Sequence, residues 1–153
     1  MIRTAILVTA LLLPGTPAVA AAEQPPVLSD RVTSTSGLAG SMYRGKWYSA
    51  AADRARRCII WRESHANYRA INSSGHAGAY QFNDAAWRVS LTWMLLPEFS
   101  KQRAEVRALR AVPINRWPRR WQDAAFFTAW RDGAGRQHWH LAGSSCNALG
   151  VAQ

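Results

Sequence analysis

The sequence has few cysteines, few acidic residues and only one long apolar run. Its two cysteines, Cys58 and Cys146, form no C-x-x-C pair, the spacing typical of redox motifs and many metal sites. The apolar run, residues 5–13, ends at Pro14 and is too short to cross a bilayer, which takes about 20 residues. No second run and no internal repeat follow. We therefore expect one folded domain and no transmembrane helix in the mature chain.

The first residues have the organisation of a secretory signal peptide. Arg3 places a positive charge before the apolar run, and Ala18-Val19-Ala20 matches a cleavage site of small residues. We predict that residues 1–20 are a signal peptide, cleaved near Ala20 or Ala22, and that the mature protein is secreted.

The charge of the chain is strongly positive. Residues 1–20 contain one of the 19 basic residues and none of the 9 acidic ones, so the formal charge falls only from +10 to +9 on cleavage. Such a field attracts polyanions, among them the anionic polymers of a cell wall. The basic residues are dispersed and accompany no DNA-binding motif, so we expect no nucleic-acid partner.

Residue spacing predicts a mainly α fold. Residues 21–45, rich in Pro, Ser, Thr and Gly, are predicted to be a flexible linker, and 46–150 the folded domain. From Trp47 onward, apolar residues recur at intervals of three and four residues, which predicts a helix ending near Glu63. Residues 66–82 lack that period and predict a small irregular β-hairpin or loop. Further helices are expected over about 85–96 after a cap at Asn83-Asp84, over 98–109, and from Pro118 to Gly133.

Two cysteines in an exported chain predict one disulfide, Cys58 to Cys146, with a redox or metal-binding role as the alternative. His138-Trp139-His140 provides two histidines without a third ligand nearby, so we predict no metal site.

Glu63 is the candidate catalytic acid. It lies four residues beyond Ile59, which places it on the apolar stripe at the C-terminal end of the first predicted helix. Apolar neighbours and the negative end of a helix both favour a protonated carboxyl, as cleavage of a glycosidic bond requires. Ser64 is expected to orient this carboxyl by a hydrogen bond. The alternative is a Glu that only bonds to backbone amides at a helix end.

Residues 58–87, and more loosely 121–146, resemble the transglycosylase-like domain of the lysozyme superfamily, which includes resuscitation-promoting factors and soluble lytic transglycosylases. The resemblance lies in Cys58-Ile59-Ile60-Trp61-Arg62-Glu63-Ser64, Asn67-Tyr68, Asn72-Ser73-Ser74-Gly75, Gly78-Ala79-Tyr80-Gln81-Phe82 and, later, Gln122-Asp123-Ala124-Ala125 and Cys146.

This resemblance implies a lysozyme-like fold that cleaves the MurNAc-GlcNAc bond of peptidoglycan with a single Glu, without a metal or cofactor. Glu63 matches the catalytic acid, and Tyr80 and Gln81 match the stretch that lines the sugar groove; Asn72 lies in the same matching region and is expected to bind substrate. In a lytic transglycosylase, Glu63 would protonate the leaving oxygen and then deprotonate the 6-hydroxyl, closing a 1,6-anhydro ring.

The chain departs from that pattern in two places. In resuscitation-promoting factors the cysteine immediately precedes the Glu, whereas Cys58 lies five residues before Glu63. The segment from Trp87 to Trp121 has no counterpart, which leaves the role of residues 88–120 open.

A hydrolysing lysozyme would need a second carboxylate, for which Asp84 is the candidate, although its position favours helix capping. Aromatic rings stack on sugars, so Tyr68, Tyr80, Trp87 and Trp130 are candidate subsites; the spacing favours the core for both tryptophans and the groove for Tyr80.

We therefore expect a secreted, wall-associated, monomeric enzyme that cleaves peptidoglycan, as a lytic transglycosylase. The alternatives are a lysozyme-type hydrolase, a wall-binding module that keeps the groove without the chemistry, and a cationic surface or nucleic-acid protein.

Overall fold

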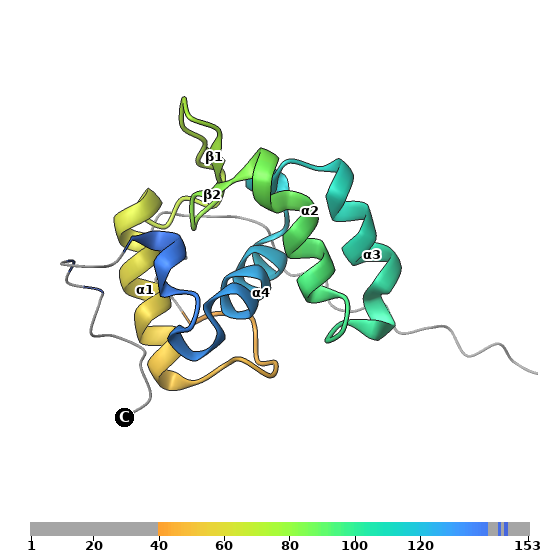
Figure 1. Ribbon diagram of the computed structural model, residues 1–153, viewed down its shortest axis with the longest axis horizontal. Helices are drawn as coiled ribbons and strands as arrows, with labels where there is room; N and C mark the ends of the chain where they lie inside the picture. The colour runs from red at the N-terminus through yellow and green to blue at the C-terminus, as the bar shows by residue number, and fades with distance from the viewer. Residues whose placement is uncertain (1–39, 141–143, 145, 147–153) are drawn as a thin grey trace, which may run out of the picture.

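The computed structural model describes residues 40–140, 144 and 146; the predicted signal peptide and residues 21–39 of the predicted linker lie outside them. Four α-helices and one two-stranded antiparallel sheet make up the main elements of the described part (Figure 1). They are α1 (Ala50–Ser64), β1 (His76–Ala77), β2 (Phe82–Asn83), α2 (Asp84–Leu95), α3 (Arg103–Ala108) and α4 (Arg119–Trp130). The prediction of a mainly α fold with a small hairpin after the first helix is confirmed.

Short 3-10 turns join and extend the later helices: η1 (Ser100–Gln102), η2 (Leu109–Ala111), η3 (Ile114–Arg116), η4 (Arg131–Gly133) and η5 (Arg136–Trp139). The single helix predicted over 98–109 is in fact η1, α3 and η2 in succession. Glu98 lies in the turn that follows α2, with its backbone N–H bonded to the Leu95 carbonyl, and its carboxylate accepts hydrogen bonds from the Tyr43 hydroxyl and the Lys46 backbone N–H.

Helix α1 is amphipathic in the way its sequence predicts. Ser49 caps it, with Oγ accepting from the Ala52 backbone N–H at 3.0 Å. Ala55, Ile59 and Ile60 lie on its buried face. The helix ends at His65, which adopts a left-handed conformation.

Helix α4 is the centre of the domain. Every residue from 121 to 130 is buried, including the polar Gln122 and Asp123. Figure 1 shows α4 between α1 on one side and α2 with α3 on the other. A helix that is buried on all faces acts as the core to which the surrounding elements attach.

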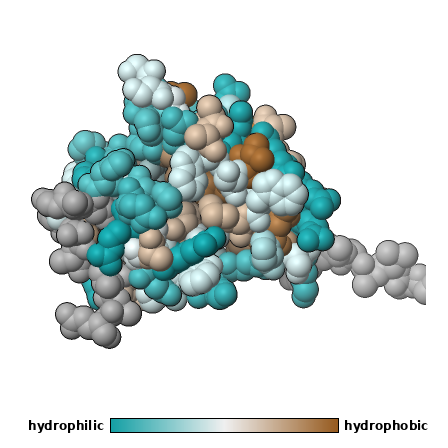
Figure 2. Space-filling view, in the orientation of Figure 1, coloured by the Kyte–Doolittle hydropathy of each residue, from teal (hydrophilic) through white to brown (hydrophobic). Residues whose placement is uncertain are grey.

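Helix α2 covers one flank of α4. Its N-cap is Asn83, whose Oδ1 accepts from the Ala86 backbone N–H, so the specific prediction that Asp84 is the cap is wrong. On the outer side, Val89 and Trp93 are exposed, and the Arg110 guanidinium lies 4.1 Å from the centre of the Trp93 ring. Figure 2 shows apolar residues gathered on this face amid hydrophilic surroundings.

Residues 41–45 pack on the domain, so the prediction of a flexible linker is wrong for them. The Ser41 hydroxyl and the Met42 backbone N–H both donate to Asp123 Oδ2. The Tyr43 ring stacks on Phe127 at 5.0 Å between centroids. The local composition is that of a flexible polar segment, but the buried Asp123 carboxylate, about 80 residues later, binds it.

The Cys58–Cys146 disulfide is present, which confirms that prediction. It attaches the end of the described chain to the middle of α1, across a sequence separation of 88 residues. Within residues 40–140, 144 and 146, no helix is long and apolar enough to span a membrane.

Candidate active site

Glu63 lies in the last turn of α1, where its side chain is 21% exposed. The expectation that it sits within the buried stripe is therefore only partly met. Ile59, one turn earlier, is fully buried, but the helix ends directly after Ser64 and the chain turns away at His65. The carboxyl thus stands at the margin of the core, partly exposed to solvent.

Arg62 is the neighbour that holds the Glu63 carboxylate. Its Nε donates to Glu63 Oε1 at 3.1 Å, and its Nη2 donates both to the same oxygen and to the backbone carbonyl of Trp139 in η5. One guanidinium therefore connects the acid to a segment 77 residues later in the chain. The local motif gives no sign of this role for Arg62, because the carbonyl that it binds is distant in the sequence.

Ser64 does not bind Glu63, so the prediction that it orients the acid directly is wrong. Its Oγ donates to the backbone carbonyl of Ala79 at 2.8 Å and accepts from the Asn67 backbone N–H. The hydroxyl faces the turn after β1, because a Ser at a helix end satisfies nearby backbone groups. Ser64 therefore fixes the turn of residues 78–82 against the end of α1.

Asn72 and Gln81, both predicted to bind substrate, come together across the hairpin. Asn72 Nδ2 donates to Gln81 Oε1 at 3.1 Å, and Gln81 Nε2 donates to the Gly78 carbonyl. Asn72 is exposed and Gln81 partly so, and Gln81 has a φ of 49°, in the left-handed region. Because Asn72 Oδ1 already accepts from the Ser74 and His76 backbone N–H groups, the pair presents mainly the remaining N–H donors of its two amides at the solvent-facing side of the hairpin.

Tyr68 and Tyr80 do not line a surface groove, which contradicts their predicted role as sugar-stacking residues. Both rings are buried, and both hydroxyls donate to Asp123 Oδ1, at 2.6 and 2.5 Å. Burial, with Asp123 as a further cause, raises the pKa of each tyrosine well above its ordinary value. Their rings belong to the core because α4 supplies a buried acceptor for each hydroxyl.

Gln122, beside Asp123 on α4, also fixes the turn that contains Ala79. Its Oε1 accepts from the Ala79 backbone N–H at 2.9 Å, and its Nε2 donates to the Tyr68 and Trp117 carbonyls. The Ala79 peptide is thus bound on both sides, by Ser64 at its carbonyl and by Gln122 at its N–H. Only the structure shows that Ser64 and Gln122 bind the same residue.

Trp139 in η5 bonds both to the turn that contains Tyr80 and to the end of α1. Its indole Nε1 donates to the Tyr80 carbonyl at 3.0 Å, while its own carbonyl accepts from Arg62. The end of α1, the turn of residues 78–82 and η5 are therefore joined in a closed series of hydrogen bonds around Glu63. Such cross-links between rigid elements fix the position of a side chain.

Trp87 and Trp130, weighed as subsites, are in different settings. Trp130 is buried in the core, as its spacing favoured. Trp87 is partly buried and lines a hollow of about 170 Å³ between α2 and η5, where its ring meets His138 edge-on at 4.4 Å between centroids. Burial, and to a lesser degree the Arg131 guanidinium, lowers the pKa of His138.

Asp84, the candidate second carboxylate, bonds to groups other than Glu63. Its Oδ1 accepts from the Ile114 backbone N–H at 2.8 Å, and its Oδ2 lies 3.6 Å from the Arg88 guanidinium. The carboxylate therefore attaches η3 to the start of α2. In this arrangement its contacts are structural.

Comparison with known proteins gives no match. No family model, no curated protein and no solved structure matches this chain. Within the described part of the chain, no group of three His, Cys, Asp or Glu side chains is arranged to hold a metal ion.

Proposed function

We propose that this protein is a secreted enzyme that cleaves the MurNAc-GlcNAc bond of peptidoglycan, with Glu63 as its general acid and base. One observation carries the proposal: a partly exposed Glu at the end of α1 stands where α1, the turn of residues 78–82 and η5 are bonded to one another. A positioned carboxyl at the margin of an apolar core is the group that glycosidic cleavage needs.

The steps assigned to Glu63 follow from its contacts. To act as an acid it must hold a proton and part from Arg62, whose side chain is one-third exposed and would keep its bond to the Trp139 carbonyl. Glu63 would then protonate the leaving oxygen of the glycosidic bond. Asn72 and Gln81, on the hairpin, offer amide groups to the hydroxyl and acetamido groups of the glycan.

The contacts of Asp84 favour a lytic transglycosylase over a hydrolase. A retaining hydrolase uses a second carboxylate about 5 Å from the acid, and an inverting one a carboxylate somewhat farther away. Asp84, the candidate for this role, bonds to the Ile114 backbone and lies beside Arg88. In the single-carboxylate route, Glu63 as a carboxylate removes the proton of the muramyl 6-hydroxyl, and that oxygen closes the anhydro ring.

The proposed location is outside the cytosol, in association with the wall. The predicted signal peptide supports export, and the positive charge supports attraction to anionic wall polymers. A wall-binding module without chemistry is the alternative from another class; it predicts binding of sacculi with no bond cleavage.

The test is mass spectrometry of the soluble products released from purified sacculi. Glu63→Gln should abolish release while leaving thermal unfolding and sacculus binding unchanged. The matched variant Asp84→Asn keeps an acceptor for the Ile114 N–H and should retain release. Anhydromuramyl ends are expected; reducing ends would favour a hydrolase, and undiminished release by Glu63→Gln would refute the assigned role.

A further inference from the structure

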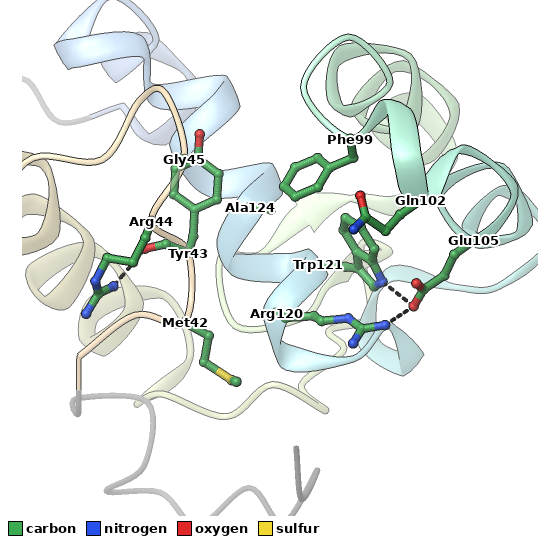
Figure 3. Close-up of a pocket in the computed structure, with 10 residues that line it drawn as sticks. All are labelled: Met42, Tyr43, Arg44, Gly45, Phe99, Gln102, Glu105, Arg120, Trp121 and Ala124. Atoms are coloured by element: carbon green, nitrogen blue, oxygen red, sulfur yellow. Dashed lines mark hydrogen bonds and ion pairs between the residues drawn. The ribbon is translucent and has the colours of Figure 1, made fainter. Parts of the chain in front are cut away.

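A second pocket, of about 200 Å³, lies over the N-terminal half of α4, between the segment 42–45 and the η1–α3 region (Figure 3). It is away from Glu63: Arg120, Trp121 and Ala124 belong to the first turns of α4, whereas the Trp139 carbonyl bound by Arg62 follows the far end of that helix. The residues that line it are Met42, Tyr43, Arg44, Gly45, Phe99, Gln102, Glu105, Arg120, Trp121 and Ala124.

One side of the pocket is polar and nearly neutral. Glu105 Oε1 accepts from the Trp121 indole N–H at 2.8 Å and from the Arg120 guanidinium, so the two opposite charges offset each other. Figure 3 shows the Glu105 carboxylate between Arg120 and Trp121, with Gln102 beside them. A neutral polar ligand suits this side better than an ion of either sign, because neither charge is left in excess.

Hydrogen-bonding capacity remains on that side. The Gln102 side chain is exposed and makes no hydrogen bond to any described residue. Glu105 Oε2 likewise accepts none within the described chain, and the enclosed Nε–H of Arg120 has no acceptor there. An amide, a carboxylate oxygen and a partly satisfied guanidinium together provide both donors and acceptors, which is what a hydroxyl group requires.

Apolar surface lines the pocket from two sides. Phe99 lies beside Gln102 at the η1 side, where its ring meets the Trp121 ring edge-on at 4.8 Å between centroids (Figure 3). Met42 adds hydrocarbon surface from the segment 42–45, where the Arg44 guanidinium donates to the Tyr43 carbonyl. The volume is below the roughly 300–1,000 Å³ of pockets that hold drug-sized molecules, so one ring is the size that fits.

We propose that this pocket binds one pyranose ring of a neutral sugar. Such a ring has apolar C–H surface to contact Met42 and Phe99, and hydroxyl groups to bond to Gln102 and Glu105. The proposal does not depend on catalysis by Glu63. In a protein that acts on glycan strands, a site of this kind would hold a strand at a point remote from the bond being cut.

The test is an NMR titration of the mature chain with N-acetylglucosamine and with glucose, following the indole N–H signals. We expect a saturable shift of the Trp121 signal, identified by its loss in Trp121→Phe, and no comparable shift of the exposed Trp93. Gln102→Ala should weaken binding roughly three- to tenfold, as expected for one hydrogen bond. Arg103→Ala, next along the chain and outside the pocket, should leave it unchanged.

Three results would overturn the proposal: no saturable shift of Trp121 with either sugar, an unchanged dissociation constant in Gln102→Ala, or tighter binding of galacturonate than of the neutral sugars. Glu63→Gln separates the two proposals. It should bind sugar in this pocket as the unmodified protein does, so loss of cleavage with retained binding tests only the catalytic assignment.

Discussion

The Tyr80 hydroxyl donates a 2.5 Å hydrogen bond to Oδ1 of Asp123, a carboxylate with no exposure to solvent. Tyr68 donates to the same oxygen at 2.6 Å, and Ser41 and the Met42 N–H donate to the other. The N-terminal segment, the loop after α1 and the turn beside Glu63 therefore meet at one side chain of α4. Asp123 is the structural centre of the fold.

Tyr80→Phe should lower the free energy of unfolding by about 1.5–3 kcal/mol, the usual contribution of a hydrogen bond to a charged group. The ring stays stacked on Phe126, so the change removes only the hydroxyl. Urea denaturation measures the loss. Tyr48→Phe is the matched control: Tyr48 makes no hydroxyl hydrogen bond to the described residues, and its loss should stay within about 0.5 kcal/mol. Equal losses in the two variants would contradict the assigned role of Asp123.

Gly78→Ala should destabilise the protein more than Gly75→Ala does. Both glycines have left-handed φ angles, +78° at Gly75 and +77° at Gly78, so each Ala incurs about 1–2 kcal/mol of backbone strain. A Cβ at Gly78 would also lie 2.4 Å from Gln122 Oε1, the acceptor of the Ala79 N–H, whereas one at Gly75 meets nothing within 4 Å.

The overlap at Gly78 should add roughly 1–3 kcal/mol to that strain, as overpacking does elsewhere. Thermal or urea unfolding of the two variants measures the difference. Release of peptidoglycan fragments should fall in Gly78→Ala and persist in Gly75→Ala, because only Gly78 adjoins the turn fixed by Ser64. Equal stability of the two variants would show that Gln122 moves aside without cost.

The pKa of His138 should lie below its ordinary value of 6.5 in the folded protein, because burial disfavours the charged imidazole and Arg131 adds repulsion. Folding therefore favours the neutral form. This group contributes to stability above the unfolded-state value of 6.5, and the contribution is lost as the pH falls from there through the folded-state pKa.

An NMR titration of the His138 ring protons measures this pKa directly. Arg131→Gln should raise it, but by less than the whole shift, since burial is the larger cause. His138→Gln should reduce the loss of stability between neutral and mildly acidic pH. A titration midpoint at or above 6.5 would show that the hollow beside Trp87 is more open to water than the structure has it.

Local pattern was enough for several features. Signals within one or two turns of the chain predicted three elements. They are α1, from apolar residues spaced three and four apart; the hairpin, from the Asn-, Ser- and Gly-rich stretch after it; and the start of α4, from Pro118. The disulfide followed from there being only two cysteines in a chain predicted to be exported. Local pattern failed at residues 41–45, which look like a polar lead and yet bind a carboxylate about 80 residues away.

The candidate site divides in the same way. Sequence by itself selected Glu63 and the hairpin bearing Asn72 and Gln81, because a motif is a local property of the chain. Tertiary structure decided that Tyr68 and Tyr80 face inward to Asp123, that Ser64 binds Ala79, and that Arg62 connects Glu63 to Trp139. The reason is physical for the two tyrosines: a buried hydroxyl must find a partner. For all but Ser64, those partners lie 43 to 77 residues away, where no spacing rule reaches.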